Sequence, residues 1–543
     1  MASAPRGGGV RLSGHPARHR HATALPRGVA LALTLLAALP SPVAAQADPA
    51  PPPAAAPRVT VTPETLRADS RAGVWRVDIA PHPGAAERPV LGAEATGDGV
   101  RLLRHWWAEG RAAGLAGVFY DNRDGGHSRL SRTDFPQLTH IDYGPELVQQ
   151  GLDRALAGRF LFRAPVLGNA SMAVTGGNAP RSLPRLAMTD PGAPMAAFLG
   201  HVHNHLHVYP AHHDYREADL FPASLPYLVV SRGSSGSDQP VLRALALAMA
   251  ALRPDTRARL EAEGLLASTL VMLLRRGVAG PLGYLTPAGH PAVIERAQLR
   301  PATMMQLAQT ITPDTIPPLV RLEVQGEGFA PAAGLSGESE RLFDTPSAVA
   351  RLWRGWDAQR QMTLSAARTA DPNGRPLEFR WVLVSGDPAR VRIEPLDAAQ
   401  SRARLTIDWH DAPVPVAPGG LPSARVEIAV IAWNGAQYSA PALVSVAFPA
   451  HERRLYAPGP DGRPRLQAVD YDAEARGAAH DPVLWWSAPW RDLAVHDDAG
   501  RLIAWRRQFR DGSSALLTPA APGSHRLVDG ERRRELQWSP PPR

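Results

Sequence analysis

The chain has 543 residues, which is more than one ordinary hydrophobic core accommodates and predicts two or three domains. Its 44% hydrophobic and 20% charged residues are typical of globular proteins, and the absence of cysteine excludes disulfides, thiolate metal sites and a thiol nucleophile. Five arginines in the leader leave +3 of the formal charge of +8 to the rest of the chain, which is too little to indicate a nucleic-acid partner.

The first 47 residues have the pattern of a secretion signal. The leader is basic and free of acids, and its apolar segment, residues 28–39, is shorter than the about 20 residues that span a bilayer. Small residues spaced for cleavage follow at 43–45 and 45–47. We therefore expect a secreted or periplasmic bacterial envelope protein with no later transmembrane segment; the alternative is an uncleaved N-terminal anchor. A Pro/Ala linker follows at 48–57.

The next segments predict a small β-rich region at 58–114 and a central mixed α/β domain at 115–318. In the first region, alternating strands are expected at 58–62 and 74–79, and a short helix at 100–113. In the central domain, apolar strands at 115–120, 166–171 and 227–231 each run into a polar loop. Helical patterns follow at 241–253, 254–264, 265–276, 291–298 and 301–311. Open α/β sheets bind ligands beyond the carboxyl ends of their strands, so we expect a site where these loops meet.

The loops supply the candidate residues. A cluster after the first strand combines carboxylates with a histidine, as general acid/base groups or ligands of a hard cation do. A hydroxyl-rich loop precedes the helix at 241–253, and backbone amides there could bind an anion. The simpler interpretations are a turn held by Asx hydrogen bonds and ordinary helix capping. The candidate catalytic residues are Asp121, Asp124, His127 and Ser235, and the candidate anion- or substrate-binding residues are Asn122, Asn169, Ser171, Ser234, Ser237 and Asp238.

Alternating histidines mark the stretch before the third loop. If residues 202–208 form a strand, His201, His203, His205 and His207 share one face. Neutral imidazoles on one face could bind a divalent transition ion such as zinc. The proposed ligands are His203, His205, His207 and Asp214; the alternative is a surface strand that is merely rich in histidine.

The C-terminal half changes to short alternating strands. After a connecting segment at 319–344, residues 345–448 predict a β-sandwich. The motif Asp371-Pro-Asn-Gly followed by Trp381, with the closing strands at 426–446, resembles the polycystic-kidney-disease (PKD) type of immunoglobulin-like module. This resemblance implies Trp381 in the core and a role as spacer or as a contact for protein or carbohydrate. The insert at 412–422 departs from the family pattern, and calcium at Asp371 is an alternative to a plain turn. Residues 449–543 form a Trp/Arg-rich extension with short strands.

Two classes of function remain open from the sequence. The chain is either an extracytoplasmic hydrolase of glycan, glycoconjugate or a phosphate or sulfate ester, or an envelope protein that binds glycan or protein through exposed tryptophans. The part outside the PKD-like module resembles uncharacterised secreted bacterial proteins, which implies export and no particular reaction.

Export can be tested directly. Secreted protein should begin after Ala45 or Ala47 when its N-terminus is sequenced, because signal peptidase cuts after small residues. Exported material that begins at Met1 would contradict this prediction.

Overall fold

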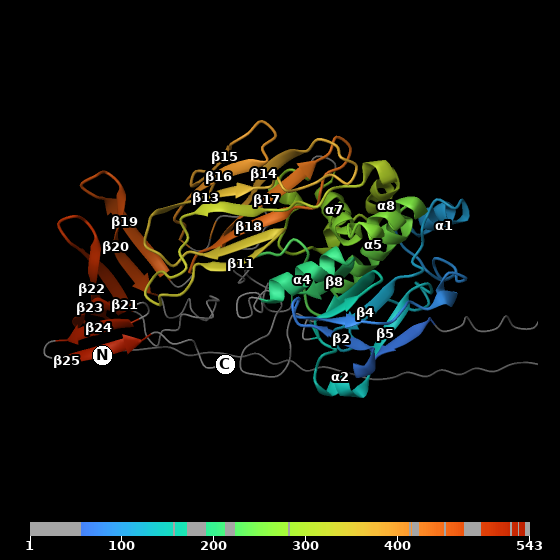
Figure 1. Ribbon diagram of the computed structural model, residues 1–543, viewed down its shortest axis with the longest axis horizontal. Coiled ribbons are helices and arrows are strands. Elements are labelled where there is room, and N and C mark those ends of the chain that lie inside the picture. Colours follow the sequence, from blue (N-terminus) through green and yellow to red (C-terminus); the bar gives the residue numbers. More distant parts are fainter. Residues whose placement is uncertain are drawn as a thin grey trace, which may run out of the picture. The chain divides into compact units, whose positions relative to one another are not determined.

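The structure is a computed structural model that describes most of the chain from residue 56 onward (Figure 1). The described ranges are 56–155, 158–170, 192–211, 223–280, 283–411, 414, 423–449, 452–471, 490–521, 524–529 and 532–537. The leader, most of the linker, Ser171 and Asp214 lie outside these ranges. None of the described helices has the length and apolarity needed to cross a membrane.

A six-stranded parallel sheet forms the centre of the α/β part, as the mixed α/β prediction requires. Its order is β1-β5-β4-β7-β8-β9, so the chain leaves β4 toward β5 on one side and returns to β7 on the other. The strands are β1 (Arg58–Val61), β4 (Phe119–Arg123), β5 (Thr139–Tyr143), β7 (Val166–Ala170), β8 (His205–Pro210) and β9 (Val229–Ser231). A reversal of this kind opens a crevice at the carboxyl ends of β4 and β7.

A three-stranded sheet accompanies the central one. It has the order β2-β3-β6, from β2 (Leu66–Asp69), β3 (Val74–Val77) and β6 (Phe160–Phe162). Two short helices complete this region, α1 (Val100–Ala108) and α2 (Pro145–Gln149). Because β1 pairs with β5, residues 58–61 belong to the central sheet rather than to a separate β region.

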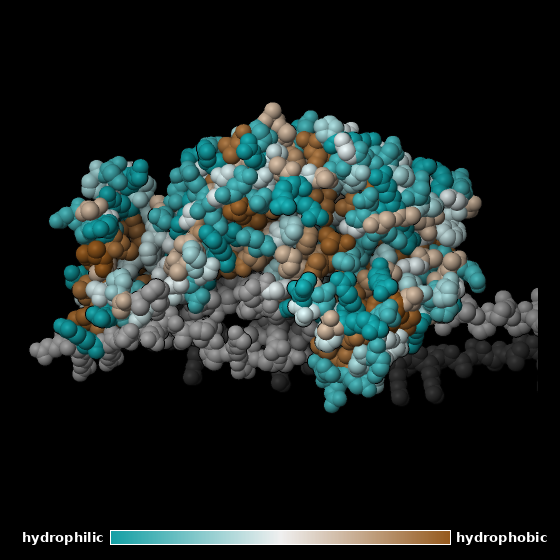
Figure 2. All heavy atoms as spheres, in the orientation of Figure 1, coloured by the Kyte–Doolittle hydropathy of each residue, from teal (hydrophilic) through white to brown (hydrophobic). Residues whose placement is uncertain are grey.

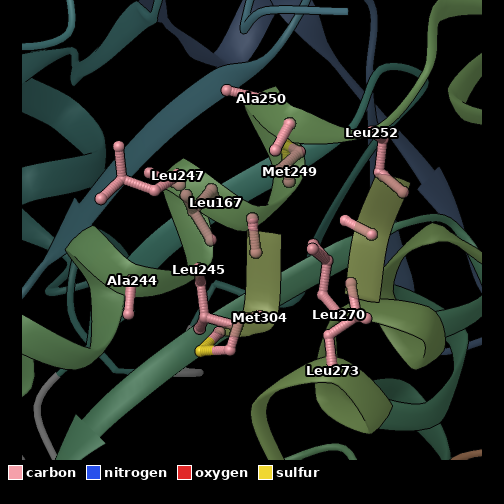
Figure 3. Packing of buried hydrophobic residues seen from close by; sticks show 14 of the residues in the cluster. Leu167, Ala244, Leu245, Leu247, Met249, Ala250, Leu252, Leu270, Leu273 and Met304 are labelled. Carbon is pink, nitrogen blue, oxygen red and sulfur yellow. The ribbon is translucent and has the colours of Figure 1, made fainter. Parts of the chain in front are cut away.

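A helix that is buried along almost its whole length carries the core of the α/β part (Figure 3). This helix, α5 (Asp238–Ala251), consists mainly of Ala, Leu and Met, which combine high helix propensity with small or flexible side chains. It packs on β7, β8 and β9 and against α7 and α8. The expected helices are confirmed as α5, α6 (Pro254–Ala262), α7 (Leu266–Ala279) and α8 (Pro301–Thr310). The expected helix at 291–298 is wrong: a 3-10 turn at Arg296–Gln298 lies there instead.

The expected strand at 202–208 is wrong in its first half. Helix α4 (Gly192–Val202) includes His201, and β8 begins only at His205. Asn204 makes the turn between them in the left-handed region, with φ of 65°. Its side chain is fixed by a hydrogen bond to the carbonyl of Glu261 and another from the amide of Leu266. The apolar run before His201 favours a helix, and the alternation of histidines hides that boundary.

The sandwich prediction is confirmed in architecture. Its two sheets have the orders β10-β13-β16-β15 and β11-β12-β18-β17-β14. Trp353 and Trp409 fill the core between them, with ring centroids 5.8 Å apart. Trp381 is only partly buried at the border of this core, where its Nε1 donates to the carbonyl of Gln400 at 2.8 Å. The strands are β10 (Glu323–Glu327), β11 (Arg341–Thr345), β12 (Ala348–Leu352), β13 (Gln359–Ser365), β14 (Glu378–Ser385), β15 (Val391–Pro395), β16 (Arg402–Asp408), β17 (Arg425–Trp433) and β18 (Ala442–Ala447).

The outer face of the five-stranded sheet is buried against the α/β part. Arg425 and Glu427 form an ion pair at 2.8 Å, and both contact Ser224, which lies just before β9. Burial alone would raise the pKa of Glu427, but the Arg425 charge and these hydrogen bonds hold it below its usual value. The sandwich is therefore joined to the α/β part through an ion pair and hydrogen bonds within a buried surface.

The Asp371-Pro-Asn-Gly turn belongs to the same junction. The Asp371 carboxylate accepts hydrogen bonds from the amides of Asn373 and Arg375 and from the side chain of Asn434. Arg259 of α6 donates to the Asn373 side chain at 2.6 Å. These contacts favour the plain turn over a calcium site, because the carboxylate is already occupied.

The C-terminal extension is a seven-stranded antiparallel sheet whose strands follow one another in chain order. Arg454 places its guanidinium 3.7 Å from the ring centre of Trp409 and thereby contacts the sandwich core. The strands are β19 (Glu452–Pro458), β20 (Pro464–Tyr471), β21 (Trp490–His496), β22 (Leu502–Phe509), β23 (Ser514–Ala521), β24 (Ser524–Asp529) and β25 (Arg532–Gln537).

The two tryptophans of the sandwich should differ in their effect on stability. Trp353 is 0% exposed, so Trp353→Ala should lower the free energy of unfolding by about 3 to 5 kcal/mol. Trp381→Ala should cost clearly less, since part of that ring is already in solvent. Urea unfolding of both variants measures the difference, and an equal or reversed order would show that Trp381 is the core residue after all.

Candidate functional site

The loops after β4 and β9 meet at the carboxyl edge of the sheet through one side chain, Asn169 at the end of β7. Its Nδ2 donates to the Asp238 carboxylate at 3.0 Å and to the carbonyl of His127 at 3.2 Å. Its Oδ1 accepts from the hydroxyl of Tyr120 at 2.9 Å and from Nδ2 of Asn122 at 3.0 Å. Asn169 is 0% exposed and uses both donors and both acceptors of its amide. Asn169 therefore ties the loop after β4 to the start of α5, while the loop after β7 lies outside the described residues.

The neighbours of Asn169 extend this network on the α5 face of the sheet. The Tyr120 hydroxyl also accepts from the amide of Leu130, and burial raises the pKa of Tyr120 to about 12. Asp238 accepts from the amide of Gly236, which also donates to the hydroxyl of Ser128. The Gly236–Ser128 contact ties the loop before α5 to the loop after β4, and the others hold each segment in place, so this face has a structural role.

The remaining candidates of this region are not gathered into a pocket. His127 and Ser235 are exposed, and Ser234 is exposed beside Ser235. Ser237 pairs with the hydroxyl of Ser231 at 2.8 Å and does not cap α5 with its side chain. Asp124 is buried within the loop. The candidate catalytic residue Ser235 thus lies on an exposed loop tip, and the candidate substrate-binding residue Ser171 lies outside the described residues.

Asp121 and His207 meet on the opposite face of the sheet. Asp121 lies within β4 rather than in the loop where it was expected, and His207 lies on β8, two strands away. The His207 Nε2 is 3.2 Å from Oδ2 of Asp121. The strand between them, β7, places Gly168 in the same row. A Cβ at Gly168 would lie 2.7 Å from Cδ2 and 2.9 Å from Nε2 of His207, so only glycine lets the imidazole cross β7.

Two further groups fix the Asp121 carboxylate. The Tyr143 hydroxyl donates to Oδ1 at 2.8 Å, and Nε of Arg123 lies 3.9 Å from Oδ2. Burial would raise the pKa of Asp121, but the His207 hydrogen bond and the Arg123 charge hold it below its usual value. The same burial, together with the Asp121 charge, raises the pKa of Tyr143 and keeps it a donor. Because an ionised carboxylate only accepts, the shared proton lies on Nε2 of His207.

This pair lies at the wall of a cleft of about 610 Å³, a volume that includes its open mouth. Its lining comes from α4, from the aromatic rings of β6, and from β4 and β8. Its charged and aromatic lining residues are Asp121, Arg123, Arg159, Phe160, Phe162, His205, His207, Tyr209 and Tyr227.

The histidines of the metal hypothesis are divided between different environments. His203 lies in the turn after α4, with Nδ1 2.8 Å from the carbonyl of Leu199. His205 is buried, with Nε2 3.1 Å from the carbonyl of Phe162. Among the residues that the structure describes, no three His, Cys, Asp or Glu side chains are grouped so that they could hold a metal. With Asp214 outside that part, zinc binding stays a prediction without geometric support from these histidines.

Sequence reasoning missed Tyr143, Arg123 and Gly168. Arg123 could have been found from the alternation of β4, since residues two apart on a strand share a face with Asp121. Tyr143 and Gly168 depend on which strands are neighbours, and a single sequence does not indicate that order.

Comparison with known proteins gives little further information. No family model matches the chain, and no curated protein matches it. One similar solved structure is described as a nucleoside hydrolase-related hypothetical protein from Saccharophagus degradans that is associated with carbohydrate metabolism, with 11% identity and a TM-score of 0.19. The match covers 52% of this chain and 62% of that one, so the chain spans about three fifths of its length. A likeness at this score carries no argument about the site.

The buried histidines around the cleft predict loss of stability in mild acid. Burial, with the nearby His207, lowers the pKa of His205 to about 3, and burial lowers that of His201 to about 4. A histidine in the unfolded chain takes up a proton near pH 6.5, so stability is complete above that pH and falls as the pH drops toward the folded-state values.

His205→Gln should remove one such contribution. Between about pH 7 and about pH 5, the free energy of unfolding of this variant should fall by about 2 kcal/mol less than that of the unaltered protein. Urea unfolding at both pH values measures this change. His105→Gln is the matched control, because the His105 side chain is 61% exposed. Identical pH dependence in the His205 variant and the unaltered protein would refute the prediction.

Proposed function

We propose that the protein is an exported hydrolase that cleaves ester bonds in the cleft beside Asp121 and His207. The observation that carries this proposal is the hydrogen bond between these two side chains across Gly168. An imidazole held by a carboxylate is the arrangement of a general base with a fixed tautomer. The Cδ2–Nε2 edge of His207 lies against Gly168, which leaves Nδ1 on the edge turned away from the sheet.

The roles of these residues follow from that orientation. Nδ1 of His207 takes a proton from water while the water oxygen bonds to the electrophilic centre of the ester. Asp121 stabilises the imidazolium that forms, and Tyr143 and Arg123 keep Asp121 ionised and in place. The ester bond then breaks, and His207 returns its proton to the departing oxygen. General base catalysis of this kind typically contributes about 10² to 10⁴ in rate.

The carboxylate content of the cleft favours esters over glycosides. Most glycosidases use two carboxylates that flank the scissile bond. Among the described residues that line this cleft, Asp121 is the one carboxylate, and it is committed to His207 and Tyr143. A carboxylic, phosphate or sulfate ester of a small molecule or sugar therefore fits better than a glycosidic bond.

The alternative of a binding protein rests on surfaces outside the cleft. Trp353, Trp409 and Trp505 are buried and unavailable as platforms, while Trp75 is 40% exposed. On the face shown in Figure 2, hydrophobic residues gather over the C-terminal sheet. Its exposed side chains include Leu455, Ile503 and Leu516. The alternative function is therefore binding of a protein through this sheet, with the PKD-type sandwich acting as a support.

A panel of chromogenic esters tests the hydrolase proposal. The mature protein should release 4-nitrophenol from at least one of the acetate, phosphate and sulfate esters. Asp121→Asn and His207→Gln should each lower that rate by about 10²-fold or more. Asp142→Asn is the matched control, because Asp142 lies on the neighbouring strand with its side chain 40% exposed and paired with Arg58.

Two outcomes would count against this function. Full activity in both the Asp121 and the His207 variant would place the chemistry elsewhere. Absence of hydrolysis of every ester would favour the binding alternative instead.

A further inference from the structure

The apolar walls of the cleft carry an inference that rests on the hydrolase proposal and adds the class of its substrate. These walls come from β3, β6, α4, β8 and the segment that leads into β9. Their residues are Val74, Phe160, Leu161, Phe162, Ala196, Ala197, Gly200, Tyr209, Tyr227 and Leu228. A hydrocarbon group that leaves water for such walls gains free energy in proportion to the apolar area that it buries.

Helix α4 borders the cleft with small side chains. Ala196, Ala197 and Gly200 are half-buried and line it, whereas Phe198 and His201 of the same helix are buried. Residues at positions i, i+1 and i+4 of a helix lie on one side of it, so these three form one continuous surface. The cleft therefore keeps its space on the α4 side because no large side chain fills it there.

Contacts between the walls fix their positions. Tyr227 donates to the carbonyl of Pro194 at 3.0 Å and so anchors α4. The ring of His205 lies 5.8 Å from that of Phe162, and its Nε2 lies 3.1 Å from the Phe162 carbonyl, which joins β8 to β6. His205 is neutral at pH 7, since burial lowers its pKa to about 3. These walls thus have a defined shape and carry no charge.

The charged residues of the cleft are already engaged with the protein. The Arg123 side chain is almost without surface for a ligand, since the residue is 2% exposed, and its Nη2 donates to the carbonyl of Leu152 at 2.7 Å. Its Nε faces Oδ2 of the ionised Asp121 at 3.9 Å. Arg159 is partly exposed and has an interaction of its own. An anionic group beside His207 would therefore meet the Asp121 charge without a cation committed to it, which is costly away from water.

We propose that the substrate is a neutral carboxylic ester with a short apolar group, which lies against Ala196 and the rings of Phe160 and Phe162 while the ester carbonyl lies next to His207. A neutral ester enters the cleft without the cost of removing a charge from water. Its hydrolysis adds water across the acyl–oxygen bond and yields an alcohol and a carboxylic acid. The acid ionises in water, so the apolar walls and the Asp121 charge that accept the ester also favour release of this product.

Equilibrium binding tests this proposal without turnover. In calorimetry on the full mature chain, acetanilide, which has a neutral amide in place of the ester, should bind at least about tenfold more tightly than benzenesulfonate or phenylphosphonate, which carry an anionic group on the same ring. Ala196→Phe should weaken acetanilide binding by about tenfold or more, because the new ring fills the α4 side of the cleft. Met195→Phe is the matched control, since it places the same ring on the same helix at a residue that is 38% exposed and does not line the cleft.

Three outcomes would overturn the neutral substrate. They are binding of either anion as tight as that of acetanilide, binding of none of the three ligands, and undiminished acetanilide binding by folded Ala196→Phe protein. If Ala196→Phe protein does not fold, the order of the three affinities in the unaltered protein decides alone.

The failure of this inference is distinguishable from the failure of the hydrolase proposal. Hydrolysis of the phosphate or sulfate ester that depends on both Asp121 and His207 would support the hydrolase and overturn the neutral substrate. Preferential binding of acetanilide, together with ester hydrolysis that Asp121→Asn and His207→Gln leave unchanged, would refute the hydrolase alone.

Discussion

The hydrogen bonds of Asn169 are the constraint on which the carboxyl edge of the sheet depends. Three chain segments that are far apart in sequence end at this one amide, which is fully buried and fully used. Loss of any partner would leave a polar group unsatisfied in the core, at a cost of about 1 to 3 kcal/mol. The start of α5 and the loop after β4 are therefore fixed together, and the strands beneath them keep their register.

The alternation of parallel strands divides the polar residues between two tasks. Asn122 and Asn169 face α5 and hold the loops, while Asp121 and His207 face the cleft. Gly168 contributes to the second task by having no side chain. The same few residues of β4, β7 and β8 thus carry both the stability of the sheet edge and the proposed chemistry on its reverse side.

Local sequence patterns predicted most helices and strands, whereas the contacts between them depend on the order of strands in the sheet. The helices α5 to α8, the loop after β9 and the sandwich follow from periodicity and composition. The division of the histidines between α4 and β8 did not follow, because alternate histidines are compatible with the end of a helix as well as with a strand. Asp121 and His207 were both named as candidates, but in different sites, since their contact requires β4 and β8 to lie on either side of β7. Trp353 was missed because the family motif draws attention to Trp381.

The buried junction between the sandwich and the α/β part has a consequence for how the gene can change. Ser224 on one side meets Glu427 and Arg425 on the other, and Arg259 holds the turn at Asn373. A recombination event that exchanged the sandwich for another module would strand a charge pair and an apolar surface in water. These two parts are expected to be inherited as one piece and to accumulate paired substitutions across the junction, unlike modules strung on a flexible tether.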